Sequence, residues 1–219
     1  MSAQVAGPTA ALAGIPAGLQ AQGLWVGHRQ LFVRFAAEAE TATMYTADAL
    51  ANEIKRWTSR SAFHSISISG RDPLANVEYI AATFEKKPTA LPTMLDCDGQ
   101  RPEGITELKS FLSLVQITLD GPVVEAQTER ALVSLKAAAQ EKLPHALVVT
   151  VDERMTDAQV IRVVEQTHAA SAATSVVVHP GAGIPLDRDR RWMTLIERAS
   201  GVHGDVRLAL RLPPPTGMR

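Results

Sequence analysis

The chain has 219 residues, of which 46% are hydrophobic and 21% are charged, the proportions of a soluble globular protein and not of a disordered tail. A formal net charge of −1 gives no field that would attract nucleic acid or an anionic membrane, and no apolar run approaches the roughly 20 residues of a membrane span. The single cysteine, Cys97, excludes an internal disulfide and a multi-cysteine metal site built by this chain alone. We therefore expect a cytoplasmic protein that binds neither nucleic acid nor membrane.

Taken in chain order, short β-rich runs alternate with helical ones, as in an α/β domain with a parallel sheet. Residues 1–18, rich in Ala, Gly and Pro, are expected to form a flexible N-terminal arm, and residues 19–219 a single domain. The expected strands lie at 31–35, 64–69, 93–96, 114–119, 146–151, 175–179 and 206–212. The expected helices lie at 46–57, 76–84, 104–111, 128–140, 156–164 and 190–199. Because a closed eight-unit barrel usually takes about 250 residues, the pattern predicts an incomplete, open (β/α) barrel of about six units.

Polar residues follow several of these strands, at the edge where parallel α/β folds bind ligands. The candidates for acid, base or divalent-metal chemistry are Asp72, Asp96, Asp98, Asp120 and His179. Turn chemistry alone also explains such residues, and a glycine pair at Gly181 and Gly183 is too short to identify a phosphate site. Cys97 lies between two aspartates, which raise a thiol pKa, so we do not expect it to act as a nucleophile.

Four segments, in order, resemble motifs of one family. Their residues are Gln20, Gln22, Gly23 and Gly27 with Phe32-Val33-Arg34, then Ser67-Ile-Ser-Gly-Arg-Asp-Pro-Leu74, Leu95-Asp-Cys-Asp-Gly99 and Val177-Val-His-Pro180. They are similar to the QGEG…FVR opening, the TGGEPL turn, the ETNG strand end and the Gln-Pro strand end of 7-carboxy-7-deazaguanine synthases in the radical SAM superfamily. The resemblance implies a partial β/α barrel, a substrate pocket at Gln20 and Gln22, and a vestigial S-adenosylmethionine site at Ser69, Gly70, Arg71 and Asp72.

The chain departs from this family where the family's iron–sulfur cluster binds. Glu38, Ala42 and Tyr45 stand where the resemblance places the three cysteines of the CxxxCxxC motif. A cluster needs several thiolates, so we expect no iron–sulfur cluster and no other cofactor. Arg71 replaces a glycine of the TGGE turn and adds bulk and positive charge, so S-adenosylmethionine is not an expected ligand either.

Two hypotheses about function follow. In the first, the chain is a cluster-less relative that acts as a binding, scaffold or regulatory subunit, alone in a homo-oligomer or beside a protein partner. In the second, it is an enzyme with new, non-radical chemistry on its acidic rim. The first predicts an exposed apolar patch, for which Met44, Tyr45 and Trp25 are candidates, although core packing explains them equally well. The Ala- and Glu-rich residues 36–45 are expected to form a helical lead-in to the helix at Thr46 and to serve as an interaction surface.

Overall fold

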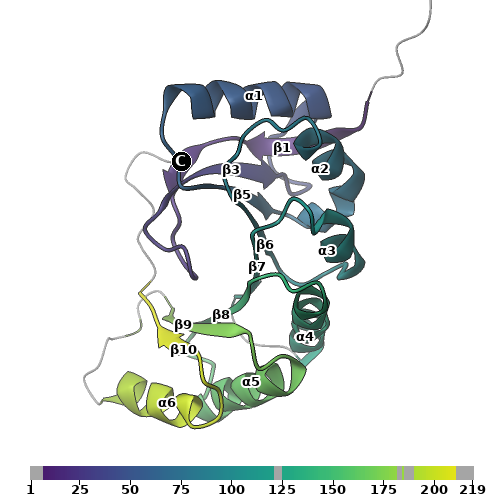
Figure 1. Ribbon diagram of the computed structural model, residues 1–219. Helices are drawn as coiled ribbons and strands as arrows, with labels where there is room; N and C mark the ends of the chain where they lie inside the picture. Colours follow the sequence, from purple (N-terminus) through teal and green to yellow (C-terminus); the bar gives the residue numbers. More distant parts are fainter. Residues whose placement is uncertain (1–6, 121–124, 182–183, 185–189, 211–219) are drawn as a thin grey trace, which may run out of the picture.

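A single curved sheet organises the molecule. The computed structural model describes residues 7–120, 125–181, 184 and 190–210. Its ten-stranded sheet has the order β10-β9-β8-β7-β6-β5-β3-β1-β4, with β2 paired to β3. Helices cover the convex side of the sheet, and the concave side lies opposite them (Figure 1). The expected α/β class with a mostly parallel sheet is confirmed.

The elements have the following bounds. The strands are β1 (Thr9–Gly14), β2 (Ala17–Leu19), β3 (Arg29–Phe35), β4 (Thr43–Thr46), β5 (Ser65–Gly70), β6 (Thr93–Cys97), β7 (Leu114–Leu119), β8 (His145–Val151), β9 (Ser175–Pro180) and β10 (Val206–Leu208). The helices are α1 (Ala47–Arg60), the 3₁₀ turn η1 (Pro73–Asn76), α2 (Val77–Phe84), α3 (Glu103–Leu108), α4 (Glu125–Gln140), α5 (Asp157–Ala170) and α6 (Arg191–Ser200). In the described part of the chain, no helix combines the length and apolarity that crossing a membrane requires.

Strands β3 and β5 to β10 run parallel to one another: β3 lies beside β5, and each strand from β5 to β9 lies beside the next one along the chain. β1 is antiparallel to both β3 and β4, and β2 is antiparallel to β3. Among the described strands the two edges are β4 and β10, which do not pair with each other, so this sheet forms an open half-barrel. Its carboxyl-terminal strand ends gather on one rim, as parallel pairing requires.

The hydrophobic core lies between the sheet and the helices. Alternate residues of each strand point toward the helices, including Ile66, Leu95, Val115 and Leu147, all 0% exposed. Each such side chain contributes about 1.5–3 kcal/mol relative to an exposed one. The intervening residues point to the concave side, and many of them are polar, unlike the apolar residues that face the helices.

The prediction that residues 1–18 form a flexible arm is wrong for the second half of this segment. Thr9–Gly14 forms β1, where Ala10 is 3% and Leu12 1% exposed, and Ala17–Leu19 forms β2. Residues 1–6 lie outside the described residues. The strand was missed because its side chains are small and its alternation is short. Pairing with strands on both sides stabilises it, and that is a tertiary effect that local propensity does not record.

The expected helical lead-in at residues 36–45 is also wrong. Thr43–Thr46 forms the edge strand β4, paired antiparallel to β1, and the helix starts only at Ala47. Thr46 caps this helix, because its Oγ1 accepts a hydrogen bond from the Ala49 N–H at 3.1 Å. Threonine and tyrosine favour strands, and the open edge of β1 supplies the partner, so pairing overrides the helical propensity of the preceding alanines.

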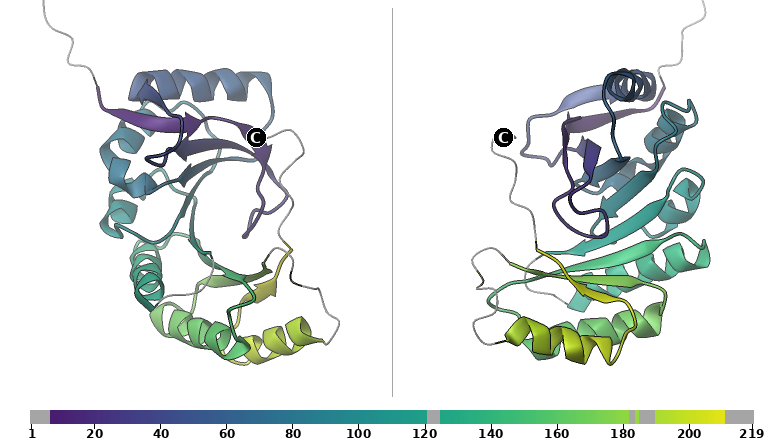
Figure 2. Two further views of the ribbon diagram at one scale, coloured as in Figure 1. Left: turned by 180° about the vertical axis from the view of Figure 1, so that it is seen from behind. Right: turned by 60° about the vertical axis from the view of Figure 1, so that its left-hand side comes forward.

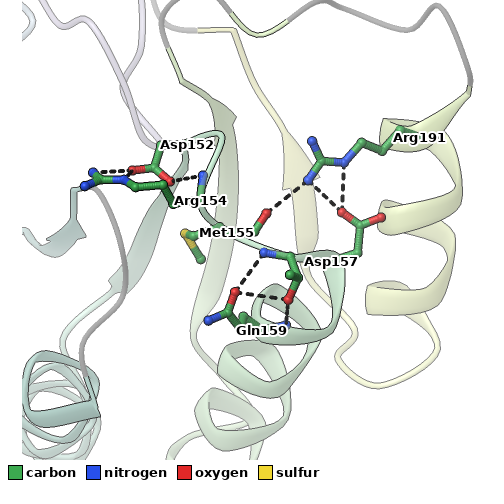
Figure 3. Close-up of polar contacts among 7 residues, drawn as sticks. Asp152, Arg154, Met155, Asp157, Gln159 and Arg191 are labelled. Carbon is green, nitrogen blue, oxygen red and sulfur yellow. Dashed lines mark hydrogen bonds and ion pairs between the residues drawn. The ribbon is translucent and has the colours of Figure 1, made fainter.

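At the opposite end of the sheet, a polar cluster fixes the start of α5 (Figure 3). The Gln159 amide oxygen accepts from the Thr156 N–H at 2.8 Å, and the Thr156 hydroxyl accepts from the Gln159 N–H at 3.3 Å, which is a capping box. Arg191 at the start of α6 donates to Asp157 at 2.8 Å and so ties the two helices together. The expected strand at 206–212 is described only to residue 210, and β10 ends at Leu208.

Candidate functional site

Polar side chains occupy many positions on the concave face of the sheet, beside apolar ones such as Met94 and Val148. Register places Gln30 opposite Ser65, Asp96 opposite Gln116, and Thr150 opposite His179. Because side chains alternate between the two faces of a strand, these residues lie on the side away from the helices. The core-facing side of the same strands is apolar, so the polarity of the concave face is specific to it.

Asp96 lies at the centre of this face, on β6. Its Oδ1 accepts a hydrogen bond from the Thr118 hydroxyl at 2.9 Å, and its Oδ2 accepts one from the Gln116 amide at 3.1 Å. Burial raises the pKa of this carboxyl above its ordinary value, and the nearby Asp120 raises it further, against the opposing effect of the hydrogen bonds from its neighbours. Perturbed pKa values cluster at functional sites, so a carboxyl whose pKa is raised by burial on a concave surface is a candidate functional group.

A loop crosses the concave face and contacts strands distant from it in the sheet. Residues 20–28, here named the crossing loop, connect β2 to β3 and extend across the trough (Figures 1 and 2). The Gly23 N–H donates to Nε2 of His179 on β9 at 3.1 Å, and the Gln22 amide donates to the Thr118 hydroxyl at 3.4 Å. Gly23 has φ +79°, and a Cβ there would lie 1.7 Å from the Gln116 Oε1. The loop therefore roofs the polar face, and only glycine fits at this contact.

Beside this roof lies a cavity of about 310 Å³, near the lower end of the range for small-molecule sites. Its lining residues are Gln22, Ser69, Gly70, Asp96, Cys97, Asp98, Thr118, Leu119, Asp120 and Gln127. Asp120 accepts from the Thr150 hydroxyl at 2.7 Å, and Asp98 accepts from the Gln100 side chain at 2.7 Å. The structure thus brings together six of the residues expected from sequence: Gln22, Ser69, Gly70, Asp96, Asp98 and Asp120.

Other expected site residues lie elsewhere. Arg71 and Asp72 do not line the cavity, and Asp72 accepts from Arg101 at 2.9 Å in an ion pair. His179 is buried on β9, where it accepts from the crossing loop. Gly70 has a structural role, because a Cβ there would lie 2.3 Å from the Phe35 carbonyl oxygen. Gln20 is buried near Asp96 and favours the ionised form of that carboxyl.

The residues at the expected cluster positions are not part of the cavity wall. Glu38 and Ala42 are exposed on the segment between β3 and β4, and Tyr45 packs partly against the core from β4. Of the expected patch, Met44 is 64% exposed, whereas the ring of Trp25 contacts His64 edge to face at 5.0 Å. The exposed apolar surface is therefore smaller than expected.

Cys97 has the properties of a core residue. Its side chain belongs to the apolar cluster under the helices, and burial raises its pKa to about 12, with the neighbouring aspartates as a minor cause. The expected direction of the shift is confirmed, although its main cause is burial. Within the described residues, no three His, Cys, Asp or Glu side chains are grouped so that they could hold a metal ion.

Several residues of this face were missed from sequence, namely Gln116, Gln127 and Thr150. The aspartates could be predicted because they lie at or near strand ends, whereas Gln116 and Thr150 lie inside strands and Gln127 lies on a helix. A signal was available for two of them: Gln116 and Thr150 are polar residues within mainly apolar strand runs, Leu114–Leu119 and His145–Val151.

Comparisons with known proteins give one distant relative. A 7-carboxy-7-deazaguanine synthase of Methanothermobacter thermautotrophicus is 33% identical over 113 residues, an alignment that covers 44% of this chain and 44% of the relative. The matched part is thus less than half of either protein, and it shows a distant relationship. No family model matches the chain.

Solved structures show only loose likeness. An apo 3-keto-D-glucoside 4-epimerase from E. coli superposes with a TM-score of 0.41 at 14% identity, covering 72% of this chain and 74% of that one. A truncated 3-deoxy-D-arabino-heptulosonate 7-phosphate synthase from Thermotoga maritima gives a TM-score of 0.40 at 10% identity, covering 84% and 82%.

Proposed function

We propose that this chain is a cluster-less relative of 7-carboxy-7-deazaguanine synthase that binds a small polar molecule in its concave cavity and serves as a binding or regulatory subunit. The observation that carries this proposal is the roofed polar cavity itself. A buried carboxyl held by two neutral donors, beside a loop that needs glycine for its contact, is costly to build and contributes little to packing. The distant relationship to 7-carboxy-7-deazaguanine synthase supports the family part of the proposal.

The residues present do not fit the iron–sulfur cluster of the radical SAM superfamily. Such a cluster is held by several cysteine thiolates. Residues 36–45 contain no cysteine, and Cys97 is buried in the core with a pKa of about 12. We therefore derive no reaction step through a cluster or through S-adenosylmethionine, and the proposed role is binding without radical chemistry.

The test is to identify what the native protein carries. We expect anaerobically purified protein to release a small molecule in stoichiometric amount on denaturation, seen by mass spectrometry, with no stoichiometric iron. A Ser69→Trp variant fills the cavity and should release none, whereas Ser59→Trp, on the exposed surface of α1, should release as much as the wild type. No released molecule from the wild type, or a brown iron-containing protein, would contradict the proposal.

A second candidate is an acid–base enzyme, favoured by the raised pKa of Asp96. In that case the wild type would convert the retained molecule on incubation, whereas Asp96→Asn would bind it and leave it unchanged. A molecule recovered intact from both proteins supports the binding role instead.

A further inference from the structure

The aspartates of this protein divide into two groups by their partners. The described residues include eight aspartates, and the five outside the cavity each form an ion pair: Asp48 with Lys86, Asp72 with Arg101, Asp152 with Arg154, Asp157 with Arg191 and Asp205 with Arg207. The three that line the cavity, Asp96, Asp98 and Asp120, form no ion pair within the described part of the chain. Among the described aspartates, those without a cationic partner are thus the three that line the cavity.

Among the described residues, the donors that hydrogen-bond to the three cavity aspartates are all neutral. Thr118 and Gln116 donate to Asp96, Gln100 donates to Asp98, and Thr150 donates to Asp120. Of the described residues that line the cavity, none is lysine, arginine or histidine. Like charges in a partly desolvated space repel one another, so the cavity carries an electrostatic cost that a bound cation would relieve.

A second observation points to a donor on the ligand. Gln22 lines the cavity and is 8% exposed, and its amide oxygen Oε1 is buried with no hydrogen-bond partner among the described residues. Buried polar atoms in native proteins are nearly always paired, so an unpaired acceptor on a side chain that lines a cavity indicates a missing donor. The cavity thus offers an unsatisfied neutral acceptor beside uncompensated carboxylates.

We propose that the ligand of this cavity is a small planar organic cation of the amidinium or guanidinium class. The inference rests on the proposed binding function and adds the charge and donor pattern of the ligand. An amidinium spreads one positive charge over several N–H donors in a plane, which matches carboxylate and amide oxygens. A metal ion fits less well, because no three ligating side chains converge in the described residues. Phosphates and carboxylates would meet acceptors and negative charge.

The test uses three probes of nearly one shape and different charge: benzamidine (+1), benzamide (neutral) and benzoate (−1). They are titrated by calorimetry into the full chain after its retained molecule has been removed by unfolding in urea, followed by refolding. We expect benzamidine to bind at least about tenfold more tightly than benzamide, and benzoate to show no binding. Asp98→Asn and Asp120→Asn should each weaken benzamidine binding about tenfold, whereas the matched control Asp152→Asn, outside the cavity, should leave it unchanged.

The outcomes separate this inference from the proposed function. If the protein releases a neutral or anionic molecule, or if benzamidine binds no better than benzamide, the cation inference is overturned while the binding function stands. If the wild type retains no molecule and binds no probe, both are overturned. Equal effects of Asp98→Asn and Asp152→Asn would show that net charge, and not the cavity, attracts the cation, and this too would overturn the inference.

Discussion

Replacing Gly23 with alanine should destabilise the protein in two separable ways. The residue has φ +79°, a conformation that costs a side chain-bearing residue about 1–2 kcal/mol. The added methyl carbon would also lie 1.7 Å from the Gln116 Oε1, so the Gln116 side chain must move. Gln116 is 0% exposed, and moving it breaks its 3.1 Å bond to Asp96. A hydrogen bond to a charged group contributes about 1.5–3 kcal/mol, so the expected total is about 2.5–5 kcal/mol.

A matched control lies four residues away in the same loop. Gly27 has φ +81°, and a Cβ there would meet no atom within 4 Å. Gly27→Ala should therefore show only the backbone cost of about 1–2 kcal/mol. The assay is equilibrium unfolding in urea, followed by circular dichroism, for the wild type and both variants. Equal losses of stability in the two variants would refute the contact between the crossing loop and Gln116.

Three further predictions concern single residues. The folded-state pKa of Asp96 lies above its unfolded value, so the unfolding free energy of the wild type should fall as the pH rises through this raised pKa. The unfolding free energy of Asp96→Asn should fall less. If the difference in unfolding free energy between the two proteins stays constant between about pH 4 and pH 8, the prediction is contradicted. Met44→Ser should change the unfolding free energy by less than about 0.5 kcal/mol, whereas Tyr45→Ser should lower it by more, because the Tyr45 ring packs against the core. Sedimentation of both variants tests whether β4 mediates association. Cys97 should react with a maleimide at pH 8 only after unfolding in urea, and rapid labelling of the native protein would show that the thiol is accessible.

Much of the fold could be predicted because strong periodic patterns determine it. The run Leu114–Leu119 was predicted at both boundaries, since turn residues flank a mainly apolar strand. The strands β1 and β4 were not, because each depends on the other for pairing across more than thirty residues of sequence. Local propensity favoured a flexible arm and a helix, and antiparallel pairing overrode both.

The site could be predicted only in part, for a similar reason. Asp96, Asp98 and Asp120 were found because parallel strands bring their carboxyl ends together. Asp72 occupies an equivalent place in sequence, but it has φ 39° and pairs with Arg101, and a contact between such distant residues leaves no local pattern. The contact between Gly23 and Gln116 could not be predicted from the sequence either, because it depends on how the crossing loop lies over the folded sheet.

The order of strands in the sheet also bears on when the cavity forms. From β3 to β10 each parallel strand pairs with its successor in the chain, so the sheet can grow as the chain emerges from the ribosome. The crossing loop is made early, yet its bond from Gly23 to His179 joins residues 156 positions apart. Because closure of so long a segment must wait for β9, the cavity acquires its roof among the last events of folding. A nascent chain that ends before β9 therefore lacks this bond, and its crossing loop is held by the Gln22–Thr118 bond to β7.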